Sequence, residues 1–140
     1  MEYKRTYNFW RNLIATPFIW SVIIPLLLLD LFMEVYHRIC FPLYHMPLVK
    51  RSSYIKIDRY KLPYLKWWEK LGCLYCEYTN GLLRYCSAIA AETEKYWCSI
   101  KHQPDPDFVA PEYQKKFADY NDEKAYNELE SHYQNLQKKK

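Results

Sequence analysis

Hydrophobic residues are concentrated near the start of the chain. From Leu13 to Leu29, seventeen consecutive residues carry no charge, and Arg11 and Asp30 bracket this run. At 1.5 Å per residue, a helix of this length reaches about 25 Å, slightly less than the ~30 Å hydrocarbon core of a bilayer. We therefore expect residues 1–46 to form a membrane-embedded helical anchor.

The apolar segment has two other interpretations. The basic residues Lys4, Arg5 and Arg11 before the apolar run also fit a secretory signal peptide. The small residues of a cleavage site are missing after the run, where Asp30 and Leu31 stand, so we expect the segment to be retained. A buried core helix is the soluble alternative, but no second element is apolar enough to cover it.

Polar residues recur at helical spacing after the apolar run. Asp30, Glu34, His37 and Arg38 form one stripe, which suits the headgroup layer. A single E-x-x-H lacks the second copy that a carboxylate-bridged iron site needs.

Basic residues lie on both flanks of the apolar segment, so the positive-inside rule does not choose an orientation. A helix that breaks at Pro25 and lies in one leaflet would keep both flanks on the cytoplasmic face, and a single span is the alternative.

The remaining sequence predicts a mainly α fold. Residues 47–61 are charged and poorly periodic, which indicates an extended connector. Residues 62–103 space their apolar positions three and four apart, which predicts a pair of helices in a small domain. Residues 104–140 begin with a proline-rich breaker and end with an amphipathic helix from about Asp122.

The composition limits the possible functions. Half of the 140 residues are hydrophobic and 19% are aromatic, which excludes disorder for most of the chain. The only glycines, Gly72 and Gly81, are too few and too far apart for a P-loop or a dinucleotide-binding loop. The net charge of +4 includes three terminal lysines, so it favours an acidic membrane surface over nucleic acid. No residue set defines an enzyme reaction or a small-molecule substrate.

Four residues have the spacing of a metal site. Cys73 and Cys76 form a C-x2-C pair, and Cys98 and His102 form a C-x3-H pair after 21 further residues. Three thiolates and one imidazole suit Zn(II) best, and iron is the other metal that such a set holds. Glu94 is a candidate acceptor for the imidazole N–H. The simpler interpretation is that Cys73 and Cys76 are small core residues.

Geometry leaves a second ligand set open. A turn at Asn80-Gly81 between two antiparallel helices would bring Cys86 opposite the C-x2-C pair and carry Cys98 about 25 Å past the turn. Either the second helix is interrupted, or Cys86 replaces Cys98 as a ligand. A third interpretation makes Cys73 and Cys76 a redox pair, although no βαβ pattern surrounds them.

Much of the chain resembles a family of small uncharacterised bacterial membrane proteins with an N-terminal hydrophobic segment. The resemblance runs from RSSYIKIDRYKLPYL through EKLGCLYCEYTNG and ETEKYWCSIKH to FADYNDEKAY. Its pattern consists of Cys73, Cys76, Asn80, Gly81, Glu94, Trp97, Cys98, Lys101 and His102. Ser99 stands where the pattern has proline. The resemblance implies the ligand set Cys73, Cys76, Cys98 and His102, and it implies no activity.

These observations predict a small accessory or scaffold protein of a bacterial inner-membrane complex, with its helical domain in the cytoplasm and held by structural zinc. Its partners would be the lipid bilayer and other membrane proteins. The alternative is a membrane-associated redox protein that uses Cys73 and Cys76 or an iron centre. Trp67 and Trp68 beside lysines fit an interfacial belt that dips toward the membrane, and packing of at least one of them in the core is the alternative.

Overall fold

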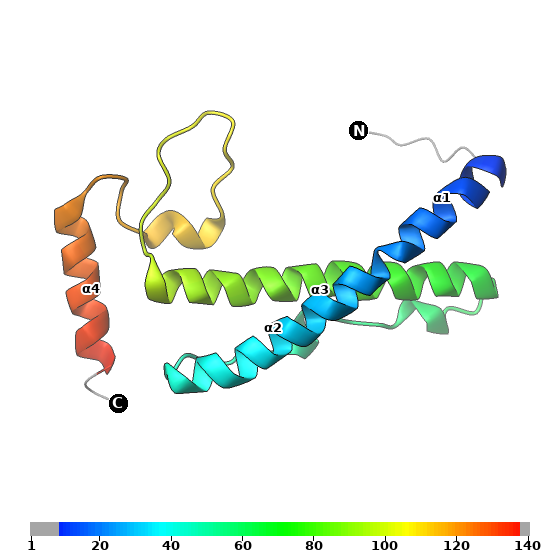
Figure 1. Ribbon diagram of the computed structural model, residues 1–140, viewed down its shortest axis with the longest axis horizontal. Coiled ribbons are helices and arrows are strands. Elements are labelled where there is room, and N and C mark those ends of the chain that lie inside the picture. Colours follow the sequence, from blue (N-terminus) through cyan, green and yellow to red (C-terminus); the bar gives the residue numbers. More distant parts are fainter. Residues whose placement is uncertain (1–8, 138–140) are drawn as a thin grey trace. The chain divides into compact units, whose positions relative to one another are not determined.

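The computed structural model describes residues 9–137, and this part of the chain is mainly helical, as predicted. The predicted flanking residues Lys4 and Arg5 and the three terminal lysines lie outside it. The elements in chain order are α1 (Phe9–Ser21), α2 (Ile23–Leu43), η1 (Arg51–Ser53), η2 (Arg59–Lys61), α3 (Trp67–Trp97), η3 (Glu112–Lys116) and α4 (Glu123–Gln137), shown in Figure 1.

Helices α1 and α2 form one long apolar rod with a break at Val22 (Figure 1). Pro25 explains the break, because its ring cannot donate a hydrogen bond to the carbonyl of Ser21 and crowds that carbonyl. The interruption predicted at Pro25 therefore lies one turn before the proline. The segment Trp10–Leu43 is long and apolar enough to cross a membrane, and its most apolar stretch of 18 residues has a mean hydropathy of 2.1.

The chain divides into two compact units, Met1–Cys86 and Ser87–Lys140. The boundary falls within α3, which contributes its first part to one unit and its last part to the other.

The helical pair predicted for residues 62–103 is wrong, because α3 is one continuous helix through Asn80 and Gly81. The Asn80 side chain donates a hydrogen bond to the carbonyl of Cys76 within the helix, at 2.8 Å. A Cβ atom at Gly81 would lie 2.9 Å from the Cα of Ile55 and from the carbonyl oxygen of Tyr54. Glycine is needed there for close approach of the connector to α3, and no turn is formed.

In the first unit, one face of α2 packs against α3 and the connector. Phe41, Leu82 and Tyr85 are almost completely buried at its centre. The connector is less extended than predicted, because residues 47–61 contain the two 3-10 turns η1 and η2. Buried Glu77 on α3 accepts the backbone N–H of Arg59 at 3.1 Å and so holds η2 against the helix.

In the second unit, the chain after α3 returns to pair with itself over a short stretch. The Ala118 N–H donates to the Ser99 carbonyl, and the Lys101 N–H donates to the Ala118 carbonyl, at 2.9 and 2.8 Å. This isolated bridge closes the proline-rich loop between them. The C-terminal helix predicted from about Asp122 is confirmed as α4, and the Asp122 carboxylate caps it by accepting the N–H of Ala125.

Candidate functional site

The predicted metal ligands are placed in two different units. Cys73 is half-buried and Cys76 exposed on the first part of α3, whereas Cys98 is exposed directly after that helix. His102 lies in the proline-rich loop, where its ring packs 4.9 Å from the ring of Phe108. Among residues 9–137, no group of three or more His, Cys, Asp or Glu side chains is arranged to hold a metal ion. The zinc site stays a prediction from the sequence.

The alternative ligand Cys86 depended on the hairpin that the structure lacks. Cys86 shares α3 with Cys73 and Cys76 and is buried. Burial raises the pKa of its thiol, which makes it a poorer metal ligand and nucleophile at neutral pH. Its position is that of a small core residue.

Glu94 is the candidate partner of the His102 imidazole. Its carboxylate is instead hydrogen-bonded to two other residues of its own unit. Its carboxylate accepts hydrogen bonds from the Tyr113 hydroxyl at 2.5 Å and from the Gln114 amide at 2.7 Å. The first of these bonds, followed by burial, raises the pKa of Tyr113. Glu94 therefore ties η3 to the end of α3.

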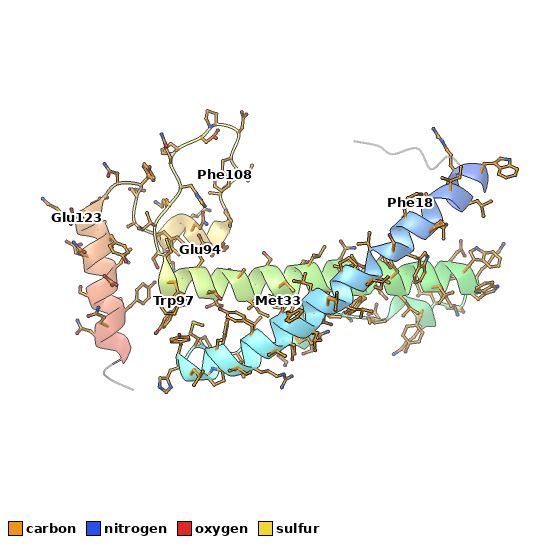
Figure 2. All side chains as sticks on the ribbon, in the orientation of Figure 1. Phe18, Met33, Glu94, Trp97, Phe108 and Glu123 are labelled. Atoms are coloured by element: carbon orange, nitrogen blue, oxygen red, sulfur yellow. The ribbon has the colours of Figure 1, made fainter. Side chains whose placement is uncertain are left out.

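The largest unusual feature is an exposed apolar surface on α1 and α2. Only 6% of the most apolar window of this segment is buried. Phe18, which projects from α1 in Figure 2, is 72% exposed. Contiguous apolar surfaces of this extent are rare on soluble monomers and mark contacts with membranes or other proteins. The surface consists of Trp10, Leu13, Ile14, Phe18, Ile19, Trp20, Val22, Ile24, Leu27, Leu28, Leu29, Leu31, Phe32, Val35, Ile39 and Leu43.

The opposite face of α2 carries the polar stripe, and it is covered by protein. Asp30 accepts two hydrogen bonds from the Arg51 guanidinium, at 2.5 and 2.6 Å, and one from the Tyr78 hydroxyl at 2.8 Å. Glu34 accepts one from the Tyr85 hydroxyl at 3.1 Å. We call Asp30, Glu34, His37, Arg51, Tyr78 and Tyr85 the polar network. Of the predicted stripe, the Arg38 side chain alone stays mostly in solvent.

His37 is buried, and both of its ring nitrogens are occupied. The Val49 N–H donates to Nε2 at 2.9 Å, so Nε2 carries no proton and the ring is neutral. The proton then sits on Nδ1, which lies 3.0 Å from the Tyr85 hydroxyl oxygen. The resulting relay runs from His37 through Tyr85 to the Glu34 carboxylate. This arrangement uses His37 to link α2 to α3 and leaves no ring nitrogen for a metal.

The network holds its tyrosines and its arginine in one protonation state over a wide pH range. Burial, followed by a hydrogen bond to a carboxylate, raises the pKa of Tyr78 and that of Tyr85 to about 12. The hydrogen bonds to Asp30 raise the pKa of Arg51 further above its usual range. The Arg51 guanidinium also lies 5.4 Å from the centre of the Tyr85 ring. These side chains form a fixed ionic and hydrogen-bonded cluster, and none of them is available as a general acid or base.

The sequence pattern identified Asp30, Glu34 and His37 of the polar network. It did not identify their partners Arg51, Tyr78 and Tyr85. Tyr78 and Tyr85 are seven residues apart, so they share one face of α3, and this spacing was the available signal. Arg51 lies in the connector, where no periodicity points to a partner.

No protein-family model, curated protein or solved structure matches this chain. Its function is therefore inferred from the chemistry of its own residues.

Proposed function

We propose that the protein is a small membrane-anchored scaffold whose exposed apolar surface on α1 and α2 lies in a lipid bilayer. The observation that carries this proposal is the sixteen large apolar side chains that this surface leaves uncovered. Full burial of one Leu, Ile or Phe side chain stabilises by roughly 1.5–3 kcal/mol, so a few of them suffice for firm attachment. A lipid phase provides that burial along the whole rod.

We further propose that the rod lies within one leaflet and does not cross the bilayer. Helix α3 is bonded to it at two places, since Tyr75 donates to the Ile19 carbonyl at 2.9 Å and Tyr85 donates to Glu34 at 3.1 Å. A crossing rod would draw this part of α3 into the hydrocarbon together with exposed Arg84. A charged side chain at the bilayer centre costs at least about 2.5–3.5 kcal/mol. Placing α3 on the water side of the rod avoids this cost.

The side of the membrane is proposed from the cysteines. All five are free thiols, which is typical of a reducing compartment and supports the cytoplasmic face of a bacterial inner membrane. The second unit would then be the part that meets other proteins of a membrane complex.

A matched pair of leucine substitutions tests the anchor. Leu28 on α2 and Leu83 on α3 are similarly exposed, at 52% and 48%. Leu28→Lys places a charge in the lipid and should lower the vesicle affinity of the full chain, measured by flotation at limiting lipid, by about tenfold or more. Leu83→Lys faces water and should leave flotation unchanged. Equal flotation of both variants, or a wild-type chain that does not float, would contradict the proposal.

A further inference from the structure

We propose that residues 56–70 form a second membrane contact, and that this contact selects anionic phospholipid headgroups. We call these residues the basic–aromatic segment. The proposal rests on the proposed function and adds the class of lipid that the protein prefers. The segment includes η2 and the start of α3, and it belongs entirely to the first unit.

The segment has an excess of positive charge that its own acidic residues leave unmatched. It contains five basic residues, Lys56, Arg59, Lys61, Lys66 and Lys70, and two acidic residues, Asp58 and Glu69, for a net charge of +3. Asp58 pairs with Lys56 at 3.2 Å, and Glu69 accepts the backbone N–H of Lys66 at 2.9 Å. Within residues 9–137, no ion pair involves Lys61, Lys66 or Lys70. A phosphate group would therefore displace no ion pair from these three ammonium groups, of which that of Lys61 lies 5.7 Å from the centre of the Tyr60 ring.

Large aromatic side chains are exposed between these lysines. Tyr64 is 75% exposed and Trp67 is 70% exposed, and Trp68 is also on the surface. The Lys66 ammonium lies 5.1 Å from the ring centre of Trp68. Tryptophan and tyrosine favour the membrane–water interface, where the ring contacts acyl chains and the polar end stays hydrated. Alternation of such rings with lysines therefore fits an anionic membrane surface.

The segment adjoins the apolar surface that the proposed function places in lipid. The rings of Trp20 and Tyr75 pack with their centres 5.4 Å apart, and the Tyr75 hydroxyl donates to the Ile19 carbonyl. These contacts bring α3 next to the end of α1 at Tyr75, about two turns after Trp67, where α3 begins (Figure 1). A bilayer that receives α1 can therefore receive Trp67 and Trp68 at its edge.

Bromolipid quenching of Trp67 and Trp68 in the full chain tests this contact. Trp10, Trp20 and Trp97 are replaced by Phe, and the protein is added to phosphatidylcholine vesicles with brominated acyl chains, with and without phosphatidylglycerol. The test variant is Lys61→Gln/Lys66→Gln/Lys70→Gln. The matched control removes three lysines of the second unit, Lys115→Gln/Lys116→Gln/Lys124→Gln.

We expect phosphatidylglycerol to increase the quenching of the two tryptophans, and added salt to reduce that increase. Each lysine near an anionic surface contributes roughly fivefold to binding, so the test variant should need on the order of 100-fold more anionic lipid for the same effect. The control variant should behave as the wild type. Quenching that ignores phosphatidylglycerol, or that persists in the test variant, overturns the proposal.

Flotation of the same samples distinguishes a failure of this inference from a failure of the proposed membrane anchor. A chain that floats but shows no dependence on anionic lipid overturns this inference alone, whereas a chain that does not float overturns the proposed function. Binding of polyglutamate without any response to phosphatidylglycerol would identify a protein-binding surface and also overturns the inference. If the tryptophan substitutions reduce helix content, a polarity-sensitive dye on Tyr64→Cys, with the native cysteines changed to Ser, gives the same readout.

Discussion

Arg51 holds the Asp30 carboxylate through two parallel hydrogen bonds, although the two residues are separated by 21 positions. Asp30 lies on α2 at the end of the most apolar stretch of the chain. The bidentate pair neutralises this carboxylate and fixes the connector on the helix. The rod can therefore present its apolar side to lipid while its polar side binds the connector of the same chain.

The Arg51–Asp30 pair should contribute measurably to stability. Arg51→Met keeps much of the side-chain volume and leaves Asp30 with the Tyr78 hydroxyl as its remaining partner. We expect the free energy of unfolding to fall by about 2–3 kcal/mol, since a largely buried carboxylate loses a charged partner. Thermal unfolding in lipid nanodiscs measures this. Lys101→Met, which breaks the exposed pair with Asp119, should cost no more than about 0.5 kcal/mol.

The two glycines of α3 should respond in opposite directions to alanine. Gly81→Ala pushes a Cβ against backbone atoms of Tyr54 and Ile55, so it should destabilise the protein by about 1–3 kcal/mol. At Gly72 a Cβ meets nothing within 4 Å, so Gly72→Ala should stabilise by up to about 1 kcal/mol through helix propensity. Chemical denaturation of both variants checks this. Equal shifts for the two would contradict the close approach at Gly81.

The tyrosines of the polar network should make the protein sensitive to alkali. Their folded-state pKa of about 12 lies above the ordinary value of 10.0, so the folded state keeps protons that the unfolded state loses. This contribution to stability is complete below pH 10 and is lost as the pH rises through 12. The melting temperature should therefore fall between pH 10 and 12. Tyr78→Phe/Tyr85→Phe should flatten this fall, and an unchanged slope would argue against buried hydrogen-bonded tyrosines.

The zinc predicted from the sequence can be tested by elemental analysis of protein purified without added metal. The ligand set Cys73, Cys76, Cys98 and His102 predicts one equivalent of zinc per chain. Cys98→Ala and His102→Ala should then lose the metal, and Cys86→Ala should keep it. A preparation without zinc, or one in which Cys98→Ala and His102→Ala keep their metal, would falsify this ligand set. Visible absorbance would indicate iron instead.

The helices of this chain could be predicted in large part from residue patterns. The uncharged run before Asp30 identified the apolar rod, and the spacing of apolar residues after Asp122 identified α4. Asn80-Gly81 was misleading, because the same dipeptide that favours a turn also allows a second backbone to approach a helix closely. Local sequence does not distinguish these uses, since the deciding neighbour, Ile55, lies 26 positions away.

The candidate site was less predictable than the fold. The stripe of Asp30, Glu34 and His37 was visible, but its partners lie in a connector and on a helix far along the chain. Long-range pairing of this kind depends on how helices pack, which residue spacing within each helix does not determine. The C-x2-C and C-x3-H pairs were identified from local spacing alone. The two pairs belong to different units, and a common site for them stays a prediction.

Labelling both ends of the apolar rod in sealed vesicles tests the central claim most directly. In a chain with its native cysteines changed to Ser, Arg11→Cys and Leu48→Cys each introduce one thiol, before and after the segment that would enter the lipid. If the rod lies in one leaflet, a membrane-impermeant maleimide added outside should label both variants equally, or neither until the vesicles are opened. Labelling of one end from outside and of the other only after opening would mean that the rod crosses the bilayer, and would contradict the account.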